Sequence, residues 1–156
     1  KSDKFSTENI SSKSSTDNTV CFNNSIKTGT VNLLLYTISY DETLTNKQLA
    51  TRVIQTRDSI GKRYIQGPVE GSHMTTEEAY TPFFGDDKVS NLNSFKTKSI
   101  WQVKDAYMSG PFINYWIEDK RNNRFLVAEG FVFAPSVEKR AYIFELESMI
   151  HSISVK

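Results

Sequence analysis

The ten residues from Val31 to Tyr40, VNLLLYTISY, constrain the fold more than any other stretch of this chain. In an extended strand, alternate side chains point to opposite faces. Both sets are apolar here: Val31, Leu33 and Leu35 on one side, and Leu34, Tyr36, Ile38 and Tyr40 on the other. A strand with two apolar faces has to be covered on each side. The pattern therefore predicts a central strand in a layered sheet.

A second constraint comes from two strand-like runs that flank a short polar connection. The runs are PFINYWIED (111–119) and RFLVAEGFVFAP (124–135), and the connection is KRNN (120–123). This pattern predicts a β-hairpin with a short polar loop. The second run has Phe125, Val127, Glu129, Phe131 and Phe133 on one face, and Leu126, Ala128, Gly130, Val132 and Ala134 on the other.

Apolar residues at helical spacing predict two helices. The first covers 45–64, where Thr45 and Gln48 match a capping box and Gly67-Pro68 ends the element. Its buried stripe is Leu49, Val53, Ile60 and Tyr64. The second covers 136–153, with Ser136 as its cap after Pro135. Its stripe is Tyr142, Leu146, Met149, Ile150 and Ile153.

The remaining segments are shorter. AYTPFF (79–84) and SIWQVKDA (99–106) are predicted as strands, separated by a polar loop, GDDKVSNLN (85–93). Val20 and Phe22 predict a short edge strand, whereas residues 1–19 are a polar segment that buries too little apolar surface to order itself. Consecutive strands without helices between them imply an antiparallel arrangement. We therefore expect a single α+β domain over 20–156, a twisted, mostly antiparallel sheet flanked by two main helices. A ferredoxin-like fold is the alternative.

Composition excludes several functional classes. Nineteen basic and eighteen acidic residues give a net charge of +1 and alternate along the chain, so no basic face for nucleic acid is indicated. One cysteine, Cys21, excludes an internal disulfide and a cysteine-based metal site. No apolar run approaches the roughly 18 residues of a membrane span. The absence of an initiator Met and of a signal sequence leads us to expect a mature or trimmed chain, with any targeting segment outside it.

The stretch GPVEGSHMTTEE (67–78) has three interpretations. In the first, GSHM is the remnant of a common cloning tag. In the second, the stretch is a metal site, because His73 lies between Glu70 and Glu77 and zinc would accept an imidazole and two carboxylates as ligands. A useful ligand set would also need His151, from the terminal helix. We favour an ordinary loop in which Gly71 supplies a turn.

Two further groups of residues are candidates for chemistry or binding. Glu129 lies among phenylalanines, so it needs a cationic partner or acts as an acid or base with a raised pKa. We favour a salt bridge to a Lys or Arg of a neighbouring strand, on a partly open face. Trp101, Phe112 and Trp116 line a ligand groove or belong to the core, and we favour the core. No nucleophile triad or phosphate loop is present.

Four stretches together resemble one known family. They are RDSIGKRYIQGPVEGSHMTTE (57–77), IWQVKDAYMSGPF (100–112), NNRFLVAEGFVFAPSVEKR (122–140) and LESMIHSI (146–153). From about Gly29 to Ser154 the chain resembles the C-terminal half of a Bacteroidetes envelope family, domain of unknown function 4837. The family carries E-G-S-aromatic-M, which implies that Glu70 to Met74 are native and weakens the metal hypothesis. Departures from its pattern are His73 and Phe133 for Tyr, and Ser109 for Gly.

The resemblance implies a lipoprotein anchored through an N-terminal cysteine after a signal peptide. Cys21 has no apolar signal before it, so we expect that anchor to lie outside this chain. The order of elements is similar to the PsbP-like α/β/α sandwich. No reaction, cofactor or catalytic residue accompanies the resemblance.

We expect a non-enzymatic binding or structural module of the cell envelope, without a cofactor or metal. Its partner would be an unknown envelope protein or a small ligand, and not nucleic acid. The candidate binding residues are Glu70, His73, Trp101, Phe112, Trp116 and Glu129. The alternative is a metal- or carboxylate-dependent hydrolase or lyase that uses Glu129 or His73. A third possibility is assembly through an exposed edge strand or aromatic patch.

Overall fold

The structure is a computed structural model that describes residues 20–26 and 29–156, and its elements are strands and two main helices. The strands are β1 (Val20–Ile26), β2 (Gly29–Ser39), β3 (Thr75–Thr76), β4 (Phe83–Val89), β5 (Leu92–Val103), β6 (Met108–Asp119) and β7 (Arg124–Phe133). The helices are α1 (Asn46–Tyr64) and α2 (Arg140–His151), with two 3-10 turns, η1 (Lys104–Ala106) and η2 (Lys120–Asn122). The predicted polar segment 1–19 lies outside the described residues.

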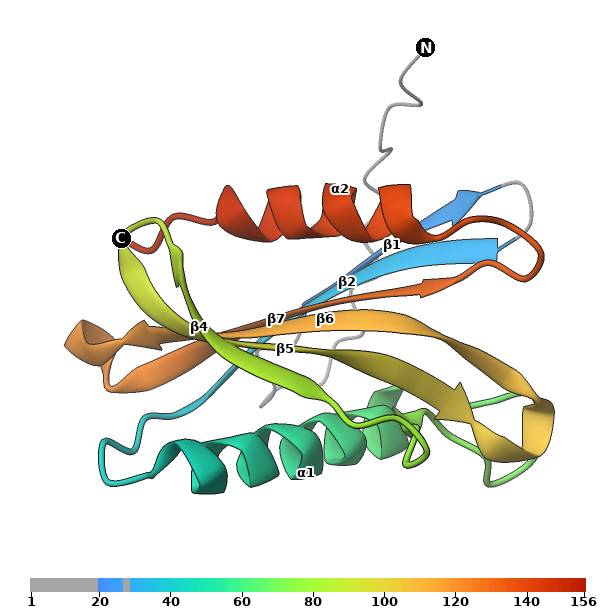
Figure 1. Cartoon of the computed structure of the whole chain (residues 1–156), viewed down its shortest axis with the longest axis horizontal. Coiled ribbons are helices and arrows are strands. Elements are labelled where there is room, and N and C mark those ends of the chain that lie inside the picture. Colours follow the sequence, from blue (N-terminus) through green and yellow to red (C-terminus); the bar gives the residue numbers. More distant parts are fainter. Residues whose placement is uncertain (1–19, 27–28) are drawn as a thin grey trace, which may run out of the picture.

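All seven strands belong to one antiparallel sheet, in the order β1-β2-β7-β6-β5-β3, and β4 also pairs with β5. Helix α2 covers one face of this sheet and α1 covers the other, so the domain has three layers (Figure 1). The predicted α+β class is confirmed. The ferredoxin-like alternative is wrong, because five strands separate the two helices where that fold has two.

Strand β2 shows why a run with two apolar faces needs this arrangement. Val31 and Leu33 pack in the cluster beneath α2, while Leu34 and Tyr36 pack beneath α1. The strand lies between β1 and β7, with Leu34 opposite Glu129. The predicted β6–β7 hairpin is also confirmed, and it turns through Asn123 at a φ of 52°.

Helix α1 begins as predicted. Thr45 accepts a hydrogen bond from the Gln48 amide, and the Gln48 side chain accepts one from the Thr45 amide. Val53 is fully buried, and one turn later Arg57 takes the next buried position. The helix approaches the backbone closely at Gly61, where a Cβ would lie 2.1 Å from the Met74 carbonyl oxygen. This contact fixes α1 against the segment that leads into β3.

Two predictions about local structure were wrong. Ser136 does not cap the last helix, because it has a φ of 63°, and α2 begins only at Arg140. The segment 85–93 is not a polar loop. Most of it belongs to β4 and β5, joined by a tight turn in which Ser90 and Asn91 have positive φ. A two-residue hairpin turn of type I′ requires positive φ at both central positions, and Ser-Asn is a weaker sequence signal for this turn than Asn-Gly.

Among the described residues, no helix is both long and apolar enough to cross a membrane.

Candidate functional site

A buried ion pair joins α1 to the middle of the sheet. Arg57 Nε lies 3.0 Å from Glu129 Oε1, and each side chain is 1% exposed. The second carboxylate oxygen of Glu129 accepts a hydrogen bond of 2.8 Å from Asn114 Nδ2, on the neighbouring strand β6. The predicted salt bridge of Glu129 therefore exists, but its partner comes from the helix, and the face is closed to solvent.

The guanidinium group of Arg57 makes further contacts that fix its orientation. Its Nη1 donates to Thr76 Oγ1 at 2.9 Å, and its Cζ lies 3.8 Å from the centroid of the Phe112 ring. Thr76 in turn donates from its amide and its hydroxyl to Asp58 Oδ1, each at 2.8 Å. Asp58 is one-third exposed, so the network runs from the core to the surface.

The environment of Glu129 has opposing effects on its ionisation. Burial raises the pKa of its carboxyl above the ordinary value, while Arg57 and Asn114 act in the opposite direction. Since arginine does not lose its proton in proteins, the contact at 3.0 Å places a permanent positive charge against the carboxyl group. The geometry is that of a closed structural ion pair, whose carboxylate is held on both oxygens and does not face a cleft.

The stretch 67–78 forms a turn and a short strand. Gly71 has a φ of 77°, and the Ser72 amide donates to the Val69 carbonyl. His73 is half-buried, with Nδ1 3.3 Å from the Gly71 carbonyl oxygen, and Glu70 is exposed. Among the described residues, no hydrogen bond or ion pair joins Glu70, His73, Glu77 and Glu129 to one another, and His151 lies in a different cluster.

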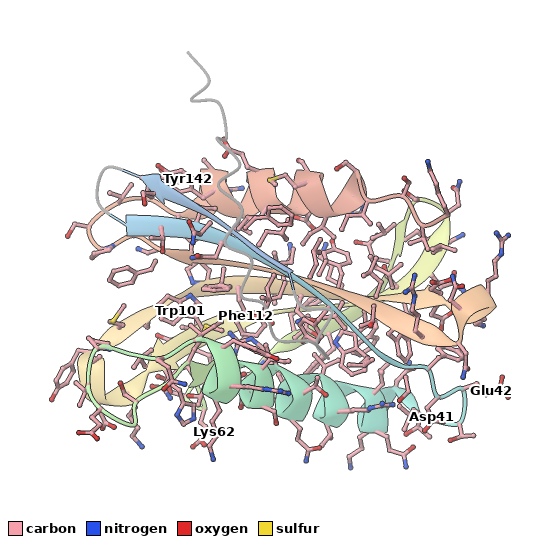
Figure 2. All side chains as sticks on the ribbon, turned by 180° about the vertical axis from the view of Figure 1, so that it is seen from behind. Asp41, Glu42, Lys62, Trp101, Phe112 and Tyr142 are labelled. Carbon is pink, nitrogen blue, oxygen red and sulfur yellow. The ribbon has the colours of Figure 1, made fainter. Side chains whose placement is uncertain are left out.

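The three aromatic candidates do not form a common pocket. Trp101 and Phe112 belong to a core cluster with Met74 and Phe131, and Figure 2 labels the two close to each other. Trp116 belongs to a separate cluster beneath α1. All three are 3% exposed or less, so they lie in the core.

A groove of about 740 Å³ lies at the opposite end of α1, where the helix begins. It is formed by the connection from β2 to α1, by the β4–β5 hairpin and by the end of the β6–β7 hairpin. Asp41 and Glu42, labelled in Figure 2, belong to its wall. Trp116 is the only one of the aromatic candidates among its lining residues.

A second polar cluster lies under the C-terminal end of α2. The Tyr115 hydroxyl lies 2.7 Å from Glu147 Oε1 and 3.1 Å from Asp87 Oδ2. His151 Nε2 is 3.2 Å from the same hydroxyl. The Lys96 ammonium contacts Asp87 at 3.3 Å and also pairs with Glu147.

Asp87, Glu147 and His151 have the residue types of a metal site, and their ligand atoms lie within 4.8 Å of one another. Lys96, however, contacts both carboxylates and supplies the positive charge that a metal ion would bring. The arrangement is explained by the ion pairs of the chain itself.

A family model described as a domain of unknown function, DUF4837, matches residues 5–152. The chain belongs to this family. Comparison with curated proteins gave no match. The buried network joins residues from separate stretches that carry the family pattern. RDS contains Arg57 and Asp58, HMTTE contains Thr76, and AEGF contains Glu129.

Sequence reasoning on the DUF4837 chain missed both polar clusters apart from Glu129 and His151. Arg57 was passed over because it lies in an apolar helical stripe where a charge was not expected, although that position alone was a signal. Asp87 was missed because its segment, 85–93, was predicted as a loop, and Lys96 was missed because it lies between that loop and the predicted strand 99–106. The spacing of Glu147 and His151, one helical turn apart, was visible in the sequence.

The cluster under α2 is expected to make the domain less stable in acid. Burial opposes ionisation of Asp87 and Glu147 most strongly. Hydrogen bonds, including those from Tyr115 and Lys96, nevertheless hold the pKa of both carboxyls below the ordinary value. Their stabilisation is therefore complete above the unfolded pKa of about 4 and is lost as the pH falls through the lower folded pKa.

We expect Lys96→Met to lower the free energy of unfolding by about 1 kcal/mol at neutral pH. The difference from the wild type should shrink toward about pH 2, because protonated carboxyls no longer attract the ammonium. Urea unfolding at several pH values measures this. Lys88→Met, an exposed lysine on the same hairpin, is the control and should have little effect. A loss that is the same at every pH would contradict the prediction.

Proposed function

We propose that this chain is a non-enzymatic binding or structural module of a Bacteroidetes cell envelope, held at the membrane by an N-terminal lipid anchor outside the chain. The proposal of a lipoprotein rests on the resemblance given above, and membership in DUF4837 is compatible with it. We also propose a PsbP-like sandwich, for which the antiparallel sheet between two helices is the support. Fractionation of cells that express the full-length precursor tests the location, and recovery from the cytoplasm would contradict it.

The observation that carries the non-enzymatic role is the state of Glu129. A catalytic acid or base has to reach a substrate atom, directly or through one water. Glu129 is 1% exposed, and its two oxygens are held by Arg57 and Asn114. An acid or base at this position would have to break the ion pair that joins α1 to the sheet.

The alternative, a hydrolase or lyase using His73 or Glu129, needs both groups, or one of them with a metal, at one reacting centre. The two side chains share no hydrogen bond or ion pair, and no group of three metal-ligating residues within the described segments includes either of them. A groove of about 740 Å³, within the size range of small-molecule sites, supports a binding role instead.

The purified protein is expected to carry no stoichiometric zinc or iron in elemental analysis. It is also expected to give no turnover of ester, phosphate-ester or glycoside substrates above that of a His73→Ala/Glu129→Gln double variant. The matched variant separates a real activity from a contaminating enzyme. One equivalent of bound metal, or a turnover that the double variant lacks, would overturn the proposal.

A further inference from the structure

The groove beside the start of α1 carries more negative than positive charge. Its charged lining residues are Asp41, Glu42, Asp86, Asp87, Lys88 and Glu118. Asp87 already pairs with Lys96, and Glu118 pairs with Lys120. Asp41, Glu42 and Asp86 have no ion pair with any described residue, and two cations oppose these three carboxylates: Lys88 in the lining, and Arg52, whose charge acts on Asp41. The uncompensated charge of the groove is therefore negative.

The inner wall of the groove is aromatic and contains a buried donor without a partner. Phe95, Trp116 and Phe125 contribute to this wall, and the Trp116 and Phe125 rings lie 5.2 Å apart. The indole Nε1 of Trp116 is buried and makes no hydrogen bond to any described residue. A buried donor normally has a partner, so its position at the wall is a second indication of a ligand.

The ammonium group of Lys120 is an example of how a cation can be bound at the edge of this groove. Lys120 Nζ lies 3.4 Å from Glu118 Oε2 and 5.6 Å from the centroid of the Tyr40 ring. Both Glu118 and Tyr40 line the groove. A carboxylate together with an aromatic face is a favourable environment for an alkylammonium ion. The Lys120 side chain is exposed, so a ligand amine can compete with it for this position.

We propose that this groove binds a flexible chain through an alkylammonium group, as presented by a lysine-containing peptide segment. This inference rests on the proposed binding function and specifies its ligand. The free carboxylates of Glu42 and Asp86 attract the ammonium, and the aliphatic part of the ligand packs over Leu44 and Leu49, which are half-buried.

Titration with trilysine, followed through the two tryptophan indole N–H signals in NMR spectra, tests the proposal. Trp116 lies at the groove, whereas Trp101 Nε1 donates to the Val132 carbonyl oxygen at the other end of α1, so Trp101 is an internal control. Trp116→Phe assigns the two signals. The Trp116 signal should shift in a saturable way, and raising the salt from about 50 to about 300 mM should weaken binding.

Glu42→Gln and Asp86→Asn should each raise the dissociation constant for trilysine about three- to ten-fold. Glu145→Gln, an exposed glutamate on α2, should leave it unchanged. Equal weakening by Glu145→Gln, or a shift of Trp101 alone, would show nonspecific attraction and overturn the inference.

Titrations with triglutamate and triserine distinguish two questions: whether the groove binds a ligand, and whether it selects for an ammonium group. If either shifts the Trp116 signal as strongly as trilysine does, the groove binds ligands but does not select for ammonium, and only this inference fails. If none of the three peptides shifts it, the inference also fails, and the binding role has to be sought at another surface. A shift with trilysine alone supports both.

Discussion

Arg57→Met is expected to lower the free energy of unfolding by about 3–5 kcal/mol, because it leaves Glu129 as an unpaired carboxylate in the core. For a domain of this size, that loss corresponds to roughly 6–20 °C in Tm. The substitution also removes the hydrogen bond to Thr76 and the contact with the Phe112 ring, and it would separate α1 from the sheet at one point. Urea unfolding followed by circular dichroism measures the change.

The double variant Arg57→Met/Glu129→Leu distinguishes loss of a pair from loss of packing. It should recover much of the stability, since replacing both members of a buried pair with apolar residues is often nearly neutral. Arg121→Met, an exposed arginine in η2, is the control for the substitution itself and should have little effect. A double variant as unstable as Arg57→Met would contradict the explanation.

The Arg57→Met variant should also respond differently to pH. Without the guanidinium group, the hydrogen bond from Asn114 is left to oppose burial, and the folded pKa of Glu129 rises further above the unfolded value. The folded state then binds a proton that the unfolded state lacks, so the stability of the variant rises relative to the wild type as the pH falls toward about 4.

Trp116→Ala is expected to cost about 3–5 kcal/mol, the range for removing a fully buried tryptophan. The side chain is completely buried beneath α1, between Phe125 and the guanidinium of Arg52, in a cluster with Val53, Phe95 and Val127. The cavity left by its removal would lie between helix and sheet. Thermal unfolding measures the loss, and a cost below about 1 kcal/mol would show that the cluster collapses to fill the space.

Phenylalanine at the two tryptophan positions gives a sharper comparison. Trp116 Nε1 has no hydrogen-bond partner among the described residues, so Trp116→Phe loses only volume. Trp101 Nε1 donates to the buried Val132 carbonyl oxygen at 3.1 Å, so Trp101→Phe also leaves that oxygen unpaired. We expect the Trp101 variant to lose about 1 kcal/mol or more beyond the Trp116 variant. Equal losses would show that the carbonyl finds another donor.

The layered sheet could be predicted from the sequence because alternation identifies both faces of a strand at once. The faces of β2 and β7 were predicted correctly from residues 31–40 and 124–135. The start of α1 was predictable because Thr45 and Gln48 form a local capping motif. Ser136 misled the prediction of α2, since the sequence alone did not reveal that the backbone at this serine is left-handed.

The polar clusters were less predictable because they depend on long-range pairing. Glu129 was noticed since a charge interrupts an apolar face, but its partner Arg57 is 72 positions earlier in the sequence and on a helix. No local pattern states which helix covers which face of a sheet. The same applies to Tyr115, whose hydroxyl meets side chains of β4 and α2.

One edge of the sheet is divided between the two strands β3 and β4, and this affects how the domain could self-associate. Neither strand runs the full length of β5, and β4 carries Asp86, Asp87 and Lys88 in succession, which disfavours pairing with a foreign strand. The opposite margin of the described sheet is β1, VCFNNSI, which contains no charged residue. If copies of this domain associate by extending their sheets, we expect the contact to form along β1, because this edge strand has no charge to oppose it.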